Sequence, residues 1–467
     1  MKISFHGADQ TVTGSKHLIS LNNGKKILLD CGMFQGMGKE TVRLNLHFGF
    51  NPAEISYVIL SHAHIDHSGL LPKLVKEGFK GKIYATPATI DITKALLQDS
   101  AFIQKQDITF LNKKRKEQGR PLLEPLYTEE DVYNTFGLFV PVVYRQPTRV
   151  DDSISFEFFD VGHIIGSATT YLTLKENNKT TTVVYSGDVG RYGDPILRSP
   201  QPFPQADYII VESTYGNKLH DPIESYSEDL YKAIQETCIG KKGKLIIPAF
   251  SVGRTQELLY ALNDLELEGR LPRIKYYLDS PLSTKITDIV KKHSDYFNRS
   301  FQKVLKYDKD PFNFTGLQYI TDKRDSQVLN SDHSPMVIIS ASGMAEAGRV
   351  KHHIANSIEN WRNTILIIGY CEPESLGARL KKRPQTVTIF GNPYQVKADI
   401  KVINSMSAHA DYNDLRQYLS CQNPNDVKRV FIVHGEPAVQ TEFKRRLMKK
   451  GYEDIEIPEL HQEFGIG

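Results

Sequence analysis

The chain has 467 residues, of which 40% are hydrophobic and 24% are charged, a composition typical of a folded globular protein. This length predicts two or three domains, or one domain with a large insertion. The net charge of +3 excludes a uniformly basic surface, so any binding of a polyanion must rely on a local groove.

The cellular compartment is indicated by the cysteines and by two absent signals. The cysteines lack CxxC spacing, which favours a reducing compartment over disulfide bonding, and they are Cys31, Cys238, Cys371 and Cys421. No apolar run approaches the roughly 18 residues of a membrane helix. The opening stretch MKISFHGADQTVTG lacks the apolar core of a signal peptide. We therefore expect a cytoplasmic protein that does not associate with membranes.

The first part of the chain is rich in strands. Short alternating or apolar runs bounded by Gly and Asn predict strands at 2–7, 16–21, 25–30 and 55–60. A helix at 68–78, a strand at 82–86 and a long helix from about Pro87 to Lys116 follow. The polar end of the long helix, NKKRKEQGR, could touch a phosphate backbone, although a solvated helix end is the commoner explanation of such a run.

An antiparallel series of strands comes next and is followed by a segment in which strands and helices alternate. The antiparallel strands are expected at 153–160, 169–176 and 180–188. After about Tyr215, strands alternate with helices, which predicts a parallel sheet covered by helices. From about Gln395 the strand-rich pattern of the first part of the chain returns, beginning with a strand at 397–405. We therefore expect a strand-rich domain formed by 1–215 and 395–467, with an α/β insert at 216–394.

Four ligand-type residues, His62, His64, Asp66 and His67, follow the strand at 55–60. Residues two apart in an extended segment share a face, so His62 and His64 can bind one metal ion together. Asp66 and His67 can turn toward a second ion as the helix begins. Nitrogen and oxygen ligands suit Zn²⁺ best, with Mn²⁺ or Fe²⁺ as alternatives. A hydrogen-bonded loop that caps the helix is the competing interpretation, and four ligand-type residues in six positions argue against it.

The spacing HxHxDH resembles the signature of the metallo-β-lactamase superfamily, and further motifs of that superfamily follow in order. Asp30 in ILLDCG matches the first motif, His163 in DVGHIIGSA the third and Asp188 in VVYSGDVG the fourth. The resemblance implies that Asp30 is a carboxylate that orients a ligand or the ligand loop. It also implies two metal ions that share Asp188 and a bridging hydroxide. The first takes His62, His64, His163 and Asp188, and the second takes Asp66, His67, Asp188 and a further histidine.

Three more motifs narrow the resemblance to the β-CASP nucleases. Glu212 in IIVESTYGNK is similar to their first motif, His409 in SMSAHADY to their second, and His434 in FIVHGE to their third and to the missing metal ligand. The α/β insert corresponds to the β-CASP domain. The fold implied is a metallo-β-lactamase αβ/βα sandwich with an inserted α/β domain. The branch indicated contains the endonuclease subunit of the mRNA 3′-end cleavage factor and its bacterial and archaeal relatives.

The resemblance implies a zinc-dependent ribonuclease, acting as an endonuclease, a 5′–3′ exonuclease or both, with single-stranded RNA in the cleft between the domains. In this family, histidine at the third motif goes with RNA-processing members and valine with DNA-repair members, so His434 favours RNA. Catalytic roles fall to Asp66, Glu212 and His409. Imidazole titrates near neutral pH, so His409 is the expected general acid. Glu212 is expected to hold its second ring nitrogen.

Two loops of the insert are candidates for binding phosphates. PAFSVGRTQE and SASGMAEAGR both run from a strand through small residues into a helix, and backbone N–H groups at helix starts favour anions. We therefore expect Arg254 in the first loop, and Ser342 and Arg349 in the second, to contact substrate. Ordinary strand–helix turns have the same pattern.

Two other functions stay open. A small-molecule hydrolase of the thioesterase or lactamase type would use the same core, but it would need neither the insert nor Glu212 and His409. An inactive scaffold in an RNA-processing complex would not retain every metal position. The first family strand begins at Lys2, so we expect no KH domain. Substrate must then be held by the chain itself or by an RNA-processing partner, and a homodimer stays open.

Overall fold

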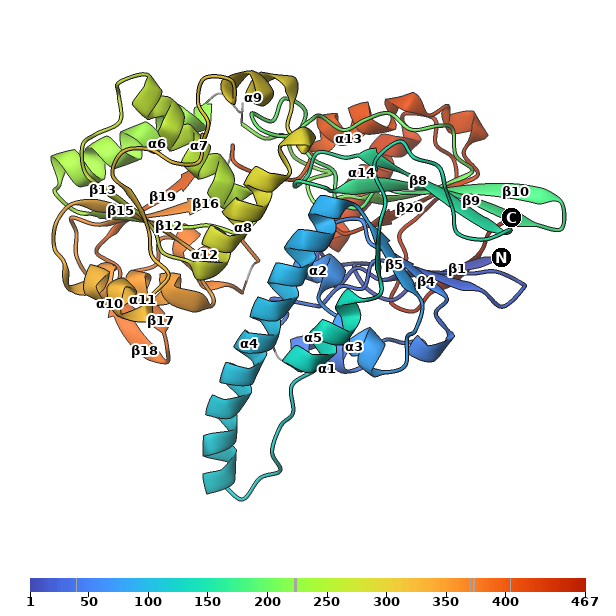
Figure 1. The fold of residues 1–467 in the computed structure, drawn as a ribbon, viewed down its shortest axis with the longest axis horizontal. Helices are drawn as coiled ribbons and strands as arrows, with labels where there is room; N and C mark the ends of the chain where they lie inside the picture. Colours follow the sequence, from blue (N-terminus) through green and yellow to red (C-terminus); the bar gives the residue numbers. More distant parts are fainter. Residues whose placement is uncertain (39, 222–224, 370, 373, 404) are drawn as a thin grey trace. The chain divides into compact units, whose positions relative to one another are not determined.

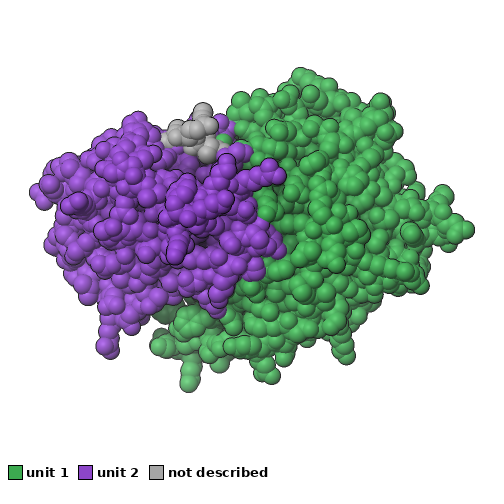
Figure 2. All heavy atoms as spheres, turned by 45° about the horizontal axis from the view of Figure 1, so that its top comes forward, with its two compact units in different colours: residues 1–192, 198–219, 409–467 green, residues 193–197, 220–408 purple. Residues whose placement is uncertain are grey.

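A computed structural model describes residues 1–38, 40–221, 225–369, 371–372, 374–403 and 405–467. By its contacts the chain divides into two compact units, which Figure 2 shows in different colours. Unit 1 comprises 1–192, 198–219 and 409–467, and unit 2 comprises 193–197 and 220–408. The domain boundaries expected at 215/216 and 394/395 stay a prediction.

Unit 1 contains two mixed β-sheets. The first has the strand order β22-β1-β2-β3-β4-β5-β6, in which β3 to β6 are parallel to one another and the other neighbours are antiparallel. Its strands are β1 (Lys2–Phe5), β2 (His17–Ser20), β3 (Lys26–Leu29), β4 (Tyr57–Ile59), β5 (Lys82–Ala85), β6 (Phe139–Pro141) and β22 (Glu463–Gly465).

The second sheet of unit 1 has the strand order β21-β20-β11-β10-β9-β8-β7. Strands β7 to β10 form an antiparallel series, whereas β10, β11, β20 and β21 are parallel. The strands are β7 (Thr148–Arg149), β8 (Ile154–Asp160), β9 (Ala168–Glu176), β10 (Lys179–Tyr185), β11 (Tyr208–Glu212), β20 (Arg429–Val433) and β21 (Ile455–Glu456).

The two sheets pack face to face because their strands alternate between two buried faces. In β3, Ile27 lies in the core between the sheets, whereas Leu28 lies in a second core against helices. In β20, Phe431 lies in the central core, whereas Ile432 packs under the C-terminal helices. Unit 1 is therefore an αβ/βα sandwich, with a layer of helices outside each sheet (Figure 1).

The helices of unit 1 begin at recognisable caps. The side chain of Thr86 accepts a hydrogen bond from the backbone of Thr89, and Pro87 occupies the first helical position of α4. Thr128 and Asp131 form a capping box on α5. The helices are α1 (Glu40–Leu46), α2 (Ile65–Ser68), α3 (Leu71–Lys76), α4 (Pro87–Glu117), α5 (Glu129–Phe136), α13 (Tyr412–Tyr418) and α14 (Pro437–Met448).

Unit 2 is built on a parallel sheet with the strand order β14-β13-β15-β12-β16-β19. The strands are β12 (Lys244–Pro248), β13 (Lys275–Leu278), β14 (Leu317–Tyr319), β15 (Met336–Ser340), β16 (Thr364–Ile368) and β19 (Asp399–Ile403), and a hairpin is formed by β17 (Thr386–Ile389) and β18 (Asn392–Gln395). The helices are α6 (Ser225–Ile234), α7 (Arg254–Leu267), α8 (Pro281–Lys292), α9 (Arg299–Val304), α10 (Lys323–Ser331), α11 (Gly348–Ser357) and α12 (Leu376–Lys381).

Most of the expected elements are confirmed, and one strand is placed differently. The long helix expected from about Pro87 to Lys116 is α4, the antiparallel series is β8 to β10, and the alternating segment forms the parallel sheet. The strand at 397–405 was expected to return to the strand-rich domain, but β19 pairs with β16 in unit 2. An edge strand with one buried face has the same alternating pattern in either sheet. Within the described residues, no helix is long and apolar enough to cross a membrane.

Candidate metal centre and active site

The ligand-type residues of unit 1 lie on loops that follow strands. Asp30 follows β3, and His62 and His64 follow β4, which runs parallel to β3. The second sheet contributes three residues that come shortly after β8, β10 and β20, namely His163, Asp188 and His434. These three strands run in one direction, so their carboxyl ends meet at one edge of the sheet. The fold thereby gathers side chains from distant parts of the sequence.

The loop that carries His64 to His67 is held by backbone hydrogen bonds. The N–H of Cys31 donates to the carbonyl of His67 at 2.7 Å, and the N–H of Ser15 donates to the carbonyl of Asp66 at 2.8 Å. At Gly32, a Cβ atom would lie 1.6 Å from the Asp66 carbonyl oxygen. Position 32 therefore accommodates only glycine, and the close approach fixes the start of α2.

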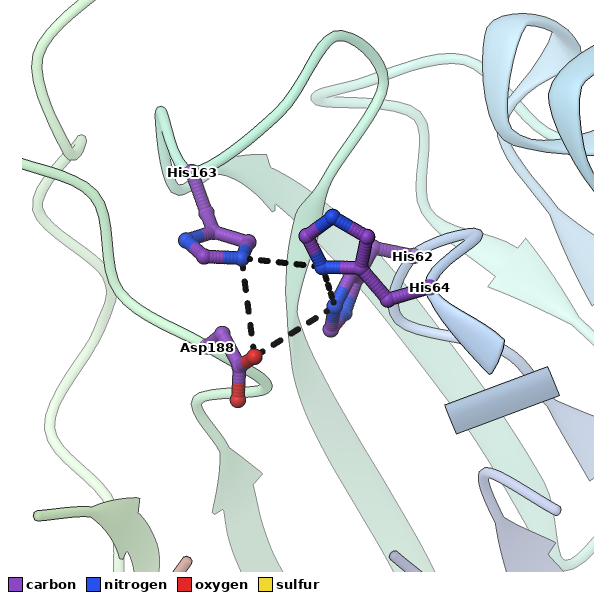
Figure 3. Close-up of side chains that lie close together, drawn as sticks. All are labelled: His62, His64, His163 and Asp188. Carbon is purple, nitrogen blue, oxygen red and sulfur yellow. Dashed lines mark hydrogen bonds and ion pairs between the residues drawn. The ribbon is translucent and has the colours of Figure 1, made fainter. Parts of the chain in front are cut away.

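Three imidazoles and one carboxylate converge in the first ligand group (Figure 3). His64 Nδ1 lies 3.2 Å from His62 Nε2 and 3.2 Å from His163 Nε2. Asp188 Oδ2 lies 3.4 Å from His62 Nε2 and 3.5 Å from His163 Nε2. Ligands around a tetrahedral Zn²⁺ at about 2.0–2.1 Å are separated by roughly 3.3 Å. These four separations are close to that value, as expected for atoms that share one metal ion.

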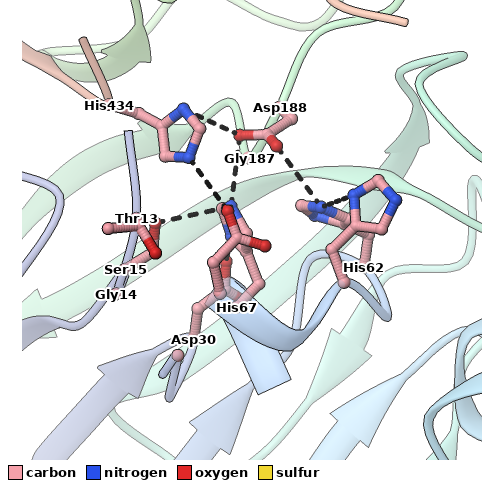
Figure 4. A network of polar contacts seen from close by, with 12 residues as sticks. Thr13, Gly14, Ser15, Asp30, His62, His67, Gly187, Asp188 and His434 are labelled. Atoms are coloured by element: carbon pink, nitrogen blue, oxygen red, sulfur yellow. Dashed lines mark hydrogen bonds and ion pairs between the residues drawn. The ribbon is translucent and has the colours of Figure 1, made fainter. Parts of the chain in front are cut away.

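A second group lies on the other side of the same carboxylate (Figure 4). Asp188 Oδ1 lies 3.2 Å from His67 Nε2 and 3.5 Å from His434 Nδ1. Asp66 Oδ2 lies 3.4 Å from His434 Nε2 and 4.0 Å from His67 Nε2. Asp188 thus directs one oxygen toward each group. All seven residues expected as metal ligands are brought together.

The donor set suits cations because it offers lone pairs rather than protons. Asp188 is buried, and its Oδ1 accepts no hydrogen bond from any described residue. Burial, reinforced by the neighbouring His62, lowers the pKa of His64 to about 3. Burial also lowers the pKa of His163 well below its ordinary value. The neutral imidazoles of His64 and His163 beside this buried carboxylate are an arrangement that a metal ion stabilises.

Asp30 contacts the ligand loop, and its role in orienting that loop stays a prediction. His67 Nδ1 lies 2.6 Å from Asp30 Oδ2, which leaves Nε2 of His67 directed at Asp188. The N–H and hydroxyl of Ser61 each donate to Asp30 at 2.6 Å, and the hydroxyl of Tyr185 donates at 2.7 Å. Burial alone would lower the pKa of His67, but Asp188 and Asp30 raise it well above its ordinary value. A cation beside Nε2 would balance the same negative charge.

Glu212 and His409 form a pair beside the ligand groups. His409 Nδ1 lies 3.1 Å from Glu212 Oε1 and 4.0 Å from Asp188 Oδ2. Glu212 also accepts hydrogen bonds from the backbone N–H groups of Val189 and Thr214, at 2.6 and 3.1 Å. Burial would lower the pKa of His409, but Glu212 and Asp188 together raise it to about 9. The negative charge of Glu212 and Asp188 therefore favours the protonated form of this imidazole.

Two supporting residues were missed from the sequence. Thr214 Oγ1 lies 3.0 Å from His434 Nδ1 and orients that ring, and Tyr185 holds Asp30. Thr214 lies in the motif IIVESTYGNK two residues after Glu212, and Tyr185 lies in the strand expected at 180–188. The structure shows that the Tyr185 hydroxyl is buried and therefore requires a partner, which the sequence does not reveal.

The three expected substrate contacts of the insert have different environments in unit 2. Arg254 is buried and pairs with Glu257, and its Nη1 donates to the carbonyl of Met406 at 2.9 Å. Arg349 Nη1 donates to Asp279 at 2.6 Å, and its Nη2 donates to the carbonyl of Thr321 at 2.7 Å. Ser342 is half-buried in the loop before α11. The contacts of the two arginines are with protein groups and do not support a direct contact with substrate, which stays a prediction.

Comparison with known proteins decides the family. Residues 17–248 match the metallo-beta-lactamase superfamily, residues 255–380 match the Beta-Casp domain, and residues 393–458 match the Zn-dependent metallo-hydrolase RNA specificity domain. The chain is 34% identical to ribonuclease TTHA0252 of Thermus thermophilus over 453 residues, which are 97% of both chains. The chain belongs to the β-CASP family of the metallo-β-lactamase superfamily.

Two further relatives are also similar to this chain over nearly its whole length. Transcription termination factor FttA of Methanosarcina mazei is 28% identical over 96% of this chain and 69% of its own length. Endoribonuclease YSH1 of Candida glabrata is 27% identical over 96% of this chain and 57% of its own length. The β-CASP chain is a hydrolase with a cluster of histidines and aspartates suited to metal. His409 and His434 fall within the RNA specificity match, and the other metal-ligand candidates fall within the metallo-β-lactamase match.

Proposed function

We propose that this chain is a metal-dependent ribonuclease that hydrolyses phosphodiester bonds of single-stranded RNA. The observation that carries the proposal is the position of Asp188, which directs one carboxylate oxygen to each of two ligand groups beside the Glu212–His409 pair. Two of the relatives are named as ribonucleases, and the C-terminal match is described as an RNA specificity domain. These descriptions favour RNA over a small-molecule substrate.

The seven ligand candidates would hold two Zn²⁺ ions, with Mn²⁺ or Fe²⁺ as alternatives. One ion would take His62, His64, His163 and Asp188, and the other would take Asp66, His67, His434 and Asp188. When bound, a two-metal centre supplies an activated water molecule and stabilises the negative charge that develops at phosphorus. Asp30 and Thr214 keep His67 and His434 in the ring orientations that such binding needs.

His409 is the proposed general acid. Its Nδ1 is held by Glu212, and its pKa of about 9 keeps the ring protonated at neutral pH. The ring therefore has a proton available for the oxygen that leaves phosphorus. Transfer to the 3′-oxygen yields one product with a 3′-hydroxyl, and the water oxygen stays on the other product as a 5′-phosphate. Glu212 acts through His409, since its own oxygens are occupied by backbone N–H groups and by that ring.

The natural setting of the reaction is also a proposal. All four cysteines are free thiols, which supports a cytoplasmic location.

Action on internal bonds and action from a 5′ end are both compatible with the chemistry. Cleavage of 5′-triphosphate, 5′-monophosphate and circular RNA of one sequence distinguishes the two modes, since only an endonuclease cuts a circle.

The proposal is tested with purified protein and 5′-labelled single-stranded RNA. We expect cleavage that stops with a chelator and returns with Zn²⁺ or Mn²⁺. His409→Ala should lower the rate about 10²–10⁴-fold while the bound metal, measured by elemental analysis, stays unchanged. Cleavage that persists at full rate without metal would contradict the proposal. Rapid thioester hydrolysis without RNA cleavage would identify a small-molecule hydrolase instead.

A further inference from the structure

The second half of α4 projects from unit 1. The buried residues of this helix all lie in its first half, and the last of them is Ala101. Residues 102–117 continue the helix for about 24 Å at 1.5 Å per residue. Figure 1 shows this part of α4 extending beyond the sheets and helices of unit 1, accompanied only by the segment that returns to α5. We call residues 102–126 the arm.

One face of the arm is covered by its own return segment. Asn112 Nδ2 donates to the carbonyl of Leu123, and the N–H of Leu123 donates to Asn112 Oδ1, both at 2.9 Å. About two helical turns before Asn112, Gln104 Oε1 accepts a hydrogen bond from the N–H of Leu126 at 3.2 Å. Residues spaced by four or eight lie on the same side of a helix. The return segment therefore rests along the side of α4 that carries Gln104 and Asn112.

The opposite face of the arm is apolar and aromatic. At 100° per residue, Phe102, Ile103 and Phe110 lie on the side away from Gln104 and Asn112. The side chains of Phe102 and Phe110 are 54% and 75% exposed. Exposed aromatic side chains gathered on one face mark an interaction site rather than a folding requirement.

Cations follow the aromatic residues toward the tip of the arm. Lys113 and Lys114 occupy the next turn, and Lys116 and Arg120 lie beyond them at the tip. All four are exposed, and no hydrogen bond or ion pair involving their side-chain nitrogens is found in the described part of the chain. Glu117 is the sole acidic residue between 108 and 123. A chain with a net charge of only +3 thus concentrates positive charge at this tip.

We propose that the arm binds single-stranded RNA, with bases stacked on Phe110 and Phe102 and phosphates paired with Lys113, Lys114, Lys116 and Arg120. Aromatic faces next to flexible cations are the combination that binds single strands without sequence preference. The local positive charge favours a polyanion over an apolar helix of a second protein. This inference rests on the proposed ribonuclease function, because it assigns to the same substrate a second point of contact.

The base of α4 connects the arm to the loop that carries His163. The hydroxyls of Thr86 and Thr89 donate to the carbonyl of Gly166, at 2.7 and 2.9 Å, three residues beyond His163. RNA bound to the arm is therefore tethered to the same rigid unit as the metal-ligand cluster. Tethering raises the effective concentration of the remaining strand at the cluster. The benefit exists only for RNA long enough to reach both points.

The test compares short and long RNA on two matched variants. The arm variant carries Phe110→Ser, Lys113→Ser, Lys114→Ser and Lys116→Ser. The control variant loses the same charge at exposed lysines elsewhere in unit 1, through Lys80→Ser, Lys449→Ser and Lys450→Ser. Substrates are unstructured RNAs of about 6 and 30 nucleotides. A single-strand binding module covers roughly 4–16 nucleotides, so the short RNA is near the lower limit of this range and the long RNA exceeds it.

We expect the arm variant to raise KM for the long RNA about tenfold, with kcat and the constants for the short RNA unchanged. Fluorescence anisotropy of the long RNA gives the slope of log affinity against log salt concentration. The magnitude of this negative slope should decrease by about 2 for three lost phosphate contacts. The control variant should match the wild type in KM. Equal constants and equal salt slopes for all three proteins would overturn the inference.

Two further outcomes remain distinguishable. If the wild type cleaves neither RNA, the ribonuclease proposal fails, and the anisotropy comparison still decides whether the arm binds RNA. If the arm variant alters sedimentation from dimer to monomer without a change in RNA affinity, the apolar face contacts a second copy of the chain. That result would also overturn the inference.

Discussion

Two clusters of histidine and aspartate in this molecule have opposite electrostatic designs. In unit 1, Asp188 is buried among imidazole nitrogens, and its Oδ1 accepts no hydrogen bond from a described residue. In unit 2, Asp279 is equally buried but accepts hydrogen bonds from Arg349, His353 and Ser326. A buried carboxylate that accepts hydrogen bonds from protein donors needs no further partner. A buried carboxylate that lacks such donors needs a cation to balance its charge.

The largest effect is expected from Asp188→Asn. An amide cannot supply one anionic oxygen to each ligand group, so metal content should drop and RNA cleavage should fall at least about 10³-fold. Added Zn²⁺ should raise the unfolding temperature of metal-free wild type by binding the folded state and should not raise that of the variant. Retained activity with normal metal content would show that Asp188 is not shared between two ions.

Asp279→Ala should act on stability instead. Removal of this carboxylate leaves Arg349 and His353 in the protein interior without their partner, which costs about 3–5 kcal/mol of unfolding free energy. Urea denaturation measures the loss, and elemental analysis should find the same metal content as in the wild type. Loss of metal without loss of stability would contradict the contrast between the two clusters.

Asp160 provides an intermediate case in unit 1. It is buried with a hydrogen bond from the N–H of Gly162 at 3.1 Å, and Arg198 lies 3.9 Å away. Burial raises its pKa to about 7, against the ordinary 3.8. A carboxyl whose pKa rises on folding opposes folding once it is ionised, so its unfavourable contribution grows between pH 4 and 7 and is then constant.

Asp160→Asn should remove this pH dependence. The amide oxygen can still accept from Gly162, so the variant should match the wild type near pH 4 and exceed its unfolding free energy at pH 8 by on the order of 4 kcal/mol. Thermal unfolding at the two pH values provides the measurement. A constant difference between the proteins at both values would show that Asp160 does not titrate with the fold.

The smallest effect is expected from Arg349→Lys, which tests whether this arginine serves the Asp279 cluster or the substrate. Lysine keeps one positive charge near Asp279 but lacks the guanidinium nitrogens that also donate to the carbonyls of Ile320 and Thr321. The substitution should lower the unfolding free energy by about 1 kcal/mol. KM for RNA should change less than twofold. A tenfold rise in KM at unchanged stability would restore Arg349 as a substrate contact.

The extent of prediction from sequence differs between these features. The spacing of His62 to His67 predicted a metal site, and the resemblance of the later motifs to the metallo-β-lactamase and β-CASP families predicted which other residues converge on it. The helical pattern from about Pro87 to Lys116 predicted α4 to within one residue of its end. Arg254 and Arg349 were predicted to contact substrate. In the structure Arg254 pairs with Glu257, its i+3 neighbour on α7, and Arg349 pairs with Asp279, which is distant in the sequence and which no local pattern identifies.

The sequence by itself determined the ligand chemistry, the alternation of buried faces and the parallel character of the insert, because each depends on spacing along a few residues. The tertiary structure alone decided that β19 joins the sheet of unit 2 and that Tyr185 supports Asp30. It also showed that the basic run of α4 lies on a projecting arm. Such outcomes depend on which distant groups compete for the same donors and surfaces, and that competition exists only in the folded chain.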